Sequence, residues 1–174
     1  PHQLIMTATP IPRTLAMSAY GDLDTSVIHG LPPGRQPIQT VVLPASRRDD
    51  LIARIAHHVA SGQQVYRAST AIEENEQIQA QAAEVAAELL RESLPELAIG
   101  LVHGQLKPAE KAAIMAEFAA GQLAVLVATT VIEVGVDVPN ASLMVIENPE
   151  RLGLSQLHQL RGRVGRGQAA RFCV

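Results

Sequence analysis

Three arginines set among glycines, near the end of the chain, carry the clearest chemical signal in the sequence. Arg161, Arg163 and Arg166 lie within residues 156–167, directly after a short apolar helix pattern. Arginine presents a rigid fork of donors that matches phosphate oxygens, and glycine lets a ligand approach the backbone closely. On one helical turn, Arg163 and Arg166 would point the same way. They could then neutralise charge on a transferring phosphoryl group, the alternative being a solvated basic helix end.

A second candidate site follows a predicted apolar strand, where doubly wound folds place their ligands. Thr129 could present its hydroxyl and amide to a backbone phosphate. Asp137, in the turn after Gly135, could accept a hydrogen bond from a ribose hydroxyl, although a plain turn residue is the alternative. Thr130 and Glu133 have capping-box spacing, which favours a structural role for that pair.

A third candidate site lies at another predicted junction between a strand and a helix. His103 and Gly104 follow the strand, and Gly104 permits close approach of a ligand. Lys107 adds positive charge, and Pro108 suits the first position of a helix, whose free amides attract anions. This junction is therefore a candidate site for a phosphate backbone.

Other chemistry finds little support in the sequence. The single cysteine, Cys173, excludes an internal disulfide and fits a reducing compartment. The six histidines show no zinc spacing, and the adjacent pair His57 and His58 is predicted to lie on a helix surface. No GxxxxGK[ST] phosphate loop and no strand-borne acidic pair for Mg²⁺ is present. A nucleotide-hydrolysing protein would therefore need another domain to hold its nucleotide.

The composition is that of a globular domain. The 174 residues are 47% hydrophobic but only 2% aromatic, so Ala, Val, Leu and Ile must build the core. The sequence contains no apolar run long enough for a membrane span and no signal-peptide pattern. The net charge of −3 argues against a general nucleic-acid binder, yet glutamates gather in 73–96 and arginines in 151–174. A basic face is therefore compatible with the negative net charge.

Strand and helix patterns alternate from residue 40 onwards. The predicted strands cover residues 40–43, 64–68, 98–102, 123–128, 143–146 and 169–174. The predicted helices cover residues 51–59, 78–89, 108–120 and 155–163. Strands separated by helices form parallel sheets that are covered on both faces. We therefore predict an α/β fold, a doubly wound parallel sheet flanked by helices.

Two of these elements carry specific expectations about burial. Ile78, Ala82, Val85 and Leu89 recur at helical spacing and are predicted to form the apolar face of their helix. Arg67 lies in an otherwise apolar strand, so its charge requires a partner or an exposed strand edge.

The first 39 residues differ from the rest. The sequence begins with proline and stops inside a predicted strand, which favours a fragment of a larger protein. The proline-rich stretch 31–37 is typical of a stiff interdomain linker. We predict that residues 1–27 end a preceding domain, that 28–39 form the linker, and that 40–174 form the main domain, truncated at its end.

Together these motifs resemble the second motor lobe of a superfamily 2 helicase. Over essentially all of its length the chain resembles the RecG-type ATP-dependent DNA helicases. Residues 7–10 resemble motif III, 63–76 occupy the place of motif IV, 128–139 resemble motif V, and 156–167 resemble motif VI. The stretches 6–14, 147–154 and 156–167 are highly specific in combination. The family usually has an aromatic and apolar residues after Tyr66, where this chain has Arg67, which bears on the packing of that strand.

The resemblance implies a RecA-like helicase C-terminal lobe with roles for individual residues. On the nucleotide side it implies arginine fingers at Arg163 and Arg166, an ordering role for Gln159, and cleft positions for Gly135 and Asp137. On the DNA side it implies backbone contacts by His103, Gly104 and Thr129, with coupling between lobes through Thr7 and Thr9. Arg161 would stabilise the loop or face the DNA.

By the same resemblance, the parent protein would be a helicase that remodels replication forks and branched DNA in recombination and repair. Its cofactor would be ATP, with Mg²⁺ held by the first RecA-like lobe, outside this chain. Its partners would be forked or branched DNA, the first lobe and a wedge domain, without a membrane, in the nucleoid-associated bacterial cytoplasm. Lacking Walker A and B motifs, the fragment alone would be inactive. The alternatives are another superfamily 2 motor, such as the transcription-repair coupling factor, or a non-catalytic binding module.

Overall fold

Six parallel strands form one sheet in the computed structural model, which describes residues 26, 28, 37–70, 75–129, 138, 140–164 and 170–174. The strands are β1 (Ile38–Thr40), β2 (Gln64–Ser69), β3 (Ile99–Val102), β4 (Val125–Thr129), β5 (Ala141–Ile146) and β6 (Arg171–Cys173). Their order in the sheet is β1-β6-β5-β2-β4-β3, and every pair is parallel. The carboxyl ends of all strands therefore meet at one edge, here called the carboxyl edge.

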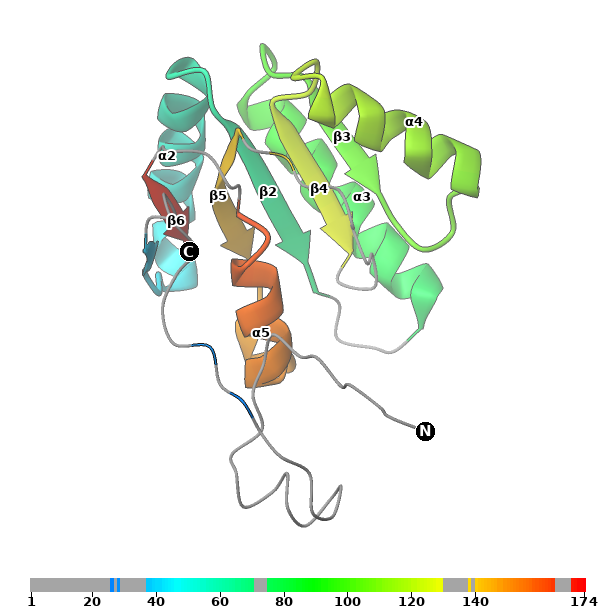
Figure 1. Ribbon diagram of the computed structural model, residues 1–174. Coiled ribbons are helices and arrows are strands. Elements are labelled where there is room, and N and C mark those ends of the chain that lie inside the picture. The colour runs from blue at the N-terminus through cyan, green and yellow to red at the C-terminus, as the bar shows by residue number, and fades with distance from the viewer. Residues whose placement is uncertain are drawn as a thin grey trace, which may run out of the picture.

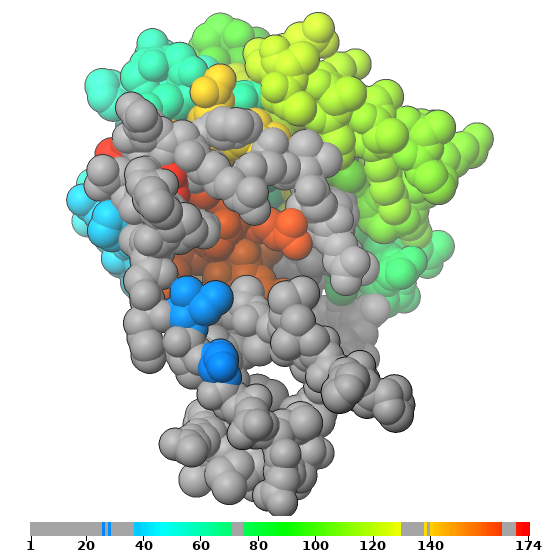
Figure 2. All heavy atoms as spheres, viewed as in Figure 1, coloured from blue at the N-terminus to red at the C-terminus, as the bar shows by residue number. Residues whose placement is uncertain are grey.

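Helices cover both faces of the sheet (Figure 1). They are α2 (Arg48–Ala60), α3 (Glu76–Ser93), α4 (Pro108–Ala119) and α5 (Leu154–Arg161), with short 3-10 helices η1 (Ala45–Arg47) and η2 (Pro149–Arg151). Ile55 of α2 and Leu90 of α3 belong to the core on one face. Phe118 of α4 belongs to the core on the other face, the partly buried Leu160 of α5 packs against that core, and Figure 2 shows these two helices on the same side of the molecule. The predicted doubly wound α/β fold is confirmed.

Strand β2 lies at the centre of the sheet and is buried along its whole length. It pairs with β5 on one side and β4 on the other, so neither of its edges is exposed. All six of its residues are buried, including the charged Arg67 at 5% exposure. Of the two predicted possibilities for Arg67, an exposed strand edge is therefore excluded, and this side chain requires an internal partner.

Helix α3 packs on the sheet through a different stripe from the one predicted. Its buried residues are Ala80, Ala83, Ala86, Ala87 and Leu90. Val85 and Leu89, which were predicted to face the core, are 59% and 47% exposed. Small alanines allow the helix to lie close to the sheet, and close packing of the whole stripe outweighs burial of two larger side chains. The glutamates that gather in this part of the chain lie on the outer side of the helix, since Glu84, Glu88 and Glu92 are exposed.

Two of the differences between predicted and observed bounds bear on the linker and on the candidate site. The first strand covers Ile38–Thr40 instead of 40–43, because pairing with β6 matches Ile38 to Arg171 and Thr40 to Cys173. The predicted boundary between linker and domain at residue 40 thus falls inside β1. Helix α5 ends at Arg161, two residues before its predicted end at 163, with Gly162 at its C-cap. Arg163 therefore lies beyond the helix, and the proposed shared helical turn with Arg166 does not begin in α5.

Candidate functional site

The carboxyl edge brings Thr129 and His103 next to each other. Thr129 ends β4 and is matched with Ser69 of β2, while the preceding Ala128 is matched with Val102 of β3. His103 follows Val102 directly and therefore lies beside Thr129. Both side chains are buried, at 3% and 8% exposure, and both carry a polar atom without a hydrogen-bond partner, Oγ1 of Thr129 and Nδ1 of His103. Buried polar atoms are usually paired, so both atoms have hydrogen-bonding capacity left for a ligand.

The surroundings of His103 carry charges of both signs. Its Nε2 atom lies 3.9 Å from Oε1 of Glu84, whose side chain is 54% exposed. The carbonyl oxygen of Gly104 accepts a hydrogen bond of 2.8 Å from Nζ of Lys111. A Cβ atom added at Gly104 would lie 3.7 Å from the carboxyl carbon of Glu76, which is ordinary van der Waals contact. Lysine and carboxylate groups therefore both border the predicted backbone-binding junction.

The start of α4 agrees with its predicted capping. Pro108 occupies the first turn, and Lys107 is the N-cap residue. The backbone amide of Lys107 donates a hydrogen bond of 3.0 Å to Oε2 of Glu110, while the Lys107 side chain is exposed. The helix start thus presents a cation to solvent, although Glu110 already satisfies one of the amides that an anion would use.

The chain beyond the end of α5 places Arg163 at a small cavity on one face of the sheet. Arg163 and Thr129 line the same small cavity, of about 40 Å³, together with Tyr66, Met144 and Leu160. Arg163 is exposed, whereas the next residue, Val164, is 1% exposed and belongs to the core. Gln159 lies on the exposed surface of α5 and does not line this cavity. The structure therefore brings Arg163 and Thr129 together and leaves Gln159 apart from them.

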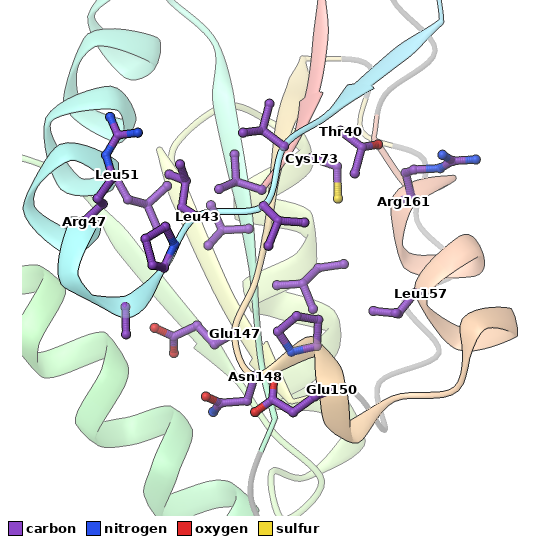
Figure 3. A pocket seen from close by; sticks show the side chains of 18 of the residues that line it. Thr40, Leu43, Arg47, Leu51, Glu147, Asn148, Glu150, Leu157, Arg161 and Cys173 are labelled. Carbon is purple, nitrogen blue, oxygen red and sulfur yellow. The ribbon is translucent and has the colours of Figure 1, made fainter.

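Arg161 faces a different and larger cavity, shown in Figure 3, of about 640 Å³. Leu157 and Arg161 of α5 line one side of it, and Leu43 and Leu51 lie opposite. The Nη2 atom of Arg161 lies 3.1 Å from Nδ1 of His158, one turn earlier in the helix. Burial raises the pKa of Cys173, which also lines this cavity, and the positive charge of Arg161 acts in the opposite direction. Arg161 and Arg163 thus line two different cavities beside α5.

The partner that Arg67 requires is Glu147, which follows β5. Nη2 of Arg67 lies 2.7 Å from Oε1 of Glu147, and its Nη1 donates a hydrogen bond of 3.3 Å to the carbonyl oxygen of Ala86. Arg48 contacts the same Glu147 oxygen at 3.2 Å from the exposed side. The sequence predicted the need for a partner but not Glu147, although an acidic residue directly after another predicted strand was the available signal.

The structure also reveals a turn that the sequence pattern did not single out. Asn148 has a left-handed backbone conformation and shares hydrogen bonds with Thr70 at the end of β2. The available signal was the dipeptide Asn148–Pro149, because an Asn-Pro sequence favours the start of a turn. This turn, which is hydrogen-bonded to the end of β2, leads the chain from β5 towards α5.

The adjacent histidines have separate environments. His57 is exposed, whereas His58 is partly buried with its Nε2 atom 2.6 Å from Oγ of Ser142. Within the part of the chain that the structure describes, no cluster of His, Cys, Asp or Glu could hold a metal ion. No helix of that part combines the length and apolar character needed to cross a membrane.

Several predicted site residues lie outside the described residues. They are Thr7, Thr9, Gly135, Asp137 and Arg166, together with the predicted capping box of Thr130 and Glu133. The assignments of residues 1–27 and of most of the linker also lie outside them. These assignments stay predictions.

Comparison with known proteins assigns this arrangement to a family. The chain is 68% identical over 175 residues to the ATP-dependent DNA helicase RecG of Escherichia coli (strain K12), a match that covers 100% of this chain and 25% of that protein. A solved structure of RecG bound to a three-way DNA junction is 47% identical, with a TM-score of 0.75, covering 96% of this chain and 22% of that one.

The fold itself recurs in more distant proteins. The RNA helicase Prp28 from Chaetomium thermophilum, bound to ADP, has a TM-score of 0.56 at 23% identity and covers 80% of this chain and 33% of that one. This likeness concerns the fold alone and agrees with a RecA-like parallel sheet flanked by helices. Residues 47–168, which include His103, Thr129 and the arginines around α5, match the helicase conserved C-terminal domain. The chain therefore belongs to the family of helicase conserved C-terminal domains.

Proposed function

We propose that this chain is the second motor lobe of a RecG-type ATP-dependent DNA helicase, a translocase that remodels replication forks and branched DNA in recombination and repair. The proposal is supported by the 68% identity with Escherichia coli RecG along the whole chain. The chain spans about a quarter of the length of that relative. The remaining parts, a first RecA-like lobe and a wedge domain, would contribute the nucleotide-binding loop, the Mg²⁺ ligands and the grip on the junction. The protein would act in the bacterial cytoplasm, at the nucleoid.

In this proposal the division of the chain follows the predicted one. Residues 1–27 end the first lobe, and the linker from residue 28 ends before Ile38, where β1 of the second lobe begins. Thr7 and Thr9 relay the state of the nucleotide to the DNA-binding surface. Closure of the two lobes around ATP and reopening after hydrolysis would then shift the second lobe along the DNA.

Arg163 and Arg166 are proposed as the arginine fingers of the ATP site. The observation that carries this assignment is the position of Arg163, which is exposed beyond the end of α5 and lines a small cavity together with Thr129 at the end of β4. A guanidinium group matches the phosphates of a nucleotide held by a facing lobe, and open parallel sheets bind ligands beyond the carboxyl ends of strands such as β4. Gln159 would order the loop, and Gly135 and Asp137 would line the nucleotide side, with Asp137 at the ribose.

Thr129, His103 and Gly104 are proposed as contacts to the DNA backbone. Their support is the pair of unpartnered polar atoms, Oγ1 of Thr129 and Nδ1 of His103, at neighbouring strand ends. Both atoms are buried, so contact with a phosphate requires a rotation of the side chain. The chain is only 2% aromatic, which disfavours base stacking and favours phosphate contacts with strong salt dependence and little sequence preference.

Alanine substitutions of the two fingers in the full-length protein test the ATP assignment. Arg163→Ala and Arg166→Ala should each lower the rate of DNA-stimulated ATP hydrolysis by about 10³–10⁵-fold while ATP binding is largely kept. The matched control is Arg54→Ala, which removes an exposed arginine of α2 and should leave the rate unchanged. Full turnover by Arg163→Ala or Arg166→Ala would contradict the finger role.

A second measurement separates half of a motor from a complete or a non-catalytic protein. ATP hydrolysis is measured for the 174-residue chain and for the full-length protein, each with and without forked DNA. We expect no turnover by the chain alone and DNA-stimulated turnover by the full-length protein. ATP hydrolysis by the chain alone would reveal an unrecognised nucleotide site. If neither the chain nor the full-length protein hydrolysed ATP, a non-catalytic binding module would be favoured.

A further inference from the structure

Helix α5 is attached to the domain mainly through its two ends. None of its eight residues is buried, and only Leu157 and Leu160 reach the core as partly buried side chains. After its end, Val164 is 1% exposed and anchors the chain. Figure 1 shows α5 at the end of the sheet towards which the arrows of β2, β4 and β5 point. Because its own packing is weak, the direction of α5 depends on how the chain leaves β5.

The exit from β5 is a turn with an unusual backbone conformation. Asn148 has φ 50° and ψ 55°, and it is the only non-glycine residue with positive φ in the described part of the chain. Asparagine tolerates this region better than most residues, but the conformation persists only where the surroundings hold it. Residues Pro149–Arg151 then form η2, whose first hydrogen bond runs from the Arg151 amide to the Asn148 carbonyl at 3.1 Å.

Thr70, at the end of β2, holds this turn through reciprocal hydrogen bonds. Its hydroxyl donates to the carbonyl oxygen of Glu147 and lies 3.2 Å from that of Asn148. In return, Nδ2 of Asn148 donates a hydrogen bond of 3.3 Å to the carbonyl oxygen of Thr70. The last backbone bond between these strands runs from the Glu147 amide to the Ala68 carbonyl at 3.0 Å. The two side chains therefore continue the pairing of β2 and β5 beyond the end of the sheet, as the Thr70–Asn148 clamp.

The residues next to the clamp are held by further contacts within the sheet. Glu147, whose carbonyl receives the Thr70 hydroxyl, is itself tied to the buried Arg67 by the 2.7 Å ion pair. The residue before Thr70, Ser69, is matched with Thr129 across the β2–β4 pair. Thr70 thus joins the strand ends that carry the proposed DNA contact to the turn that leads into α5.

We infer that Thr70 and Asn148 are positioning residues, which set the direction of α5 and thereby the place of Arg163. This inference rests on the proposed function, because the consequence of the placement is the approach of Arg163 to a nucleotide phosphate. A misplacement of about 1 Å at a reacting centre can cost about 100-fold in rate. If the clamp acts only through the place of Arg163, its loss should lower kcat and leave the KM for ATP nearly unchanged.

Paired substitutions in the full-length protein test the clamp. Thr70→Val removes the hydroxyl at nearly constant volume, and Asn148→Ala removes both the donor and the tolerance of positive φ. Each should lower the kcat of DNA-stimulated ATP hydrolysis by about 10- to 100-fold. Thr70→Ser keeps the hydroxyl and should retain most of the rate. Asn148→Gly keeps the backbone conformation and loses one hydrogen bond, so its loss should stay below about fivefold.

The control is Ser93→Ala, which removes a hydroxyl that donates to the Leu89 carbonyl at 2.8 Å, at the exposed end of α3. It should change neither kcat nor KM. Hydrogen–deuterium exchange provides a readout apart from activity: Thr70→Val should speed exchange of the α5 amides and leave those of β2 and β4 as protected as before.

The outcomes separate the clamp from the function on which it rests. An unchanged kcat and unchanged α5 exchange in Thr70→Val and Asn148→Ala, beside an active wild type, would overturn the clamp alone. Equal losses in Thr70→Ser and Thr70→Val would also overturn it, because the hydroxyl would then be irrelevant. A wild-type protein without ATP hydrolysis would overturn the proposed function and the inference with it.

Discussion

Two sets of polar residues lie side by side at the carboxyl edge and differ in where their hydrogen bonds go. At the ends of β2 and β5, Thr70, Glu147 and Asn148 bond to one another. At the ends of β3 and β4, His103 and Thr129 each keep a buried polar atom without a partner. The first set is closed within the domain and the second is open. A closed set holds the backbone in place, whereas an open set has hydrogen-bonding capacity left for a ligand.

The difference has an energetic basis. A hydrogen bond made inside the protein contributes about 1 kcal/mol, and a buried polar atom left unpaired costs about 1–3 kcal/mol. The open set therefore lowers the stability of the free domain, which is expected of a site that is completed only when its ligand binds. The same residue type, threonine, ends β4 and directly follows β2, so the two sets offer a direct test.

The closed set should be broken most severely by removing Arg67. Arg67→Ala leaves the partly buried Glu147 carboxylate without its internal partner and should lower the free energy of unfolding by about 3–5 kcal/mol. Arg48→Ala removes the other arginine on the same carboxylate oxygen, but its side chain is 55% exposed, so the loss should be at most about 1 kcal/mol. Urea unfolding measures the free energy of unfolding of both variants. Equal losses would show that the buried ion pair of Arg67 with Glu147 contributes no more than the exposed one.

Replacing threonine by valine at the two strand ends should have effects of opposite sign. Thr129→Val removes an unpaired buried hydroxyl, so the domain should gain about 1 kcal/mol, while binding of forked DNA weakens by up to about tenfold. Thr70→Val breaks the clamp and should lose about 1 kcal/mol of stability without weakening DNA binding. Thermal unfolding and a DNA titration at fixed salt measure both quantities. A loss of stability in Thr129→Val would mean that its hydroxyl is already satisfied.

A third polar set, at the amino edge of the sheet, predicts a smaller effect that depends on pH. Ser142 donates to Oε1 of Gln63 at 2.6 Å, so Nε2 of His58 must supply the proton of the 2.6 Å contact with Ser142. Burial, reinforced by the neighbouring His57, lowers the pKa of His58. Below about pH 6.5 the unfolded chain therefore takes up a proton that the folded domain does not.

Stability should accordingly fall as the pH decreases from about 6.5 towards the pKa of His58 in the folded domain. His58→Gln keeps a donor for Ser142 but does not titrate, so the slope of the unfolding free energy against pH should become flatter. His57→Gln changes an exposed side chain and should alter the slope less. An unchanged slope in His58→Gln would assign the pH dependence to other groups.

The sequence pattern alone was sufficient for the order of the elements and for the parallel sheet. Periods of strand and helix are local properties, so the predicted elements around β2, α4 and β4 agree with the structure to within a few residues. The sequence also showed that Arg67 required a partner, since a charge in a buried strand is costly unless paired. The helicase family followed from short motifs, which are likewise local.

Only the tertiary structure decided which residues meet. The contact of Arg67 with Glu147 joins residues 80 apart in the chain, and the clamp of Thr70 with Asn148 joins residues 78 apart. The helical periodicity predicted that Val85 faces the core. In the structure Val85 is exposed, because alanines of α3 pack closely against the sheet instead. Local periodicity constrains each element by itself. The pairing of β2 with β5 and the packing of each helix on the sheet depend on the free energy of the whole fold. A single segment of sequence therefore does not determine them.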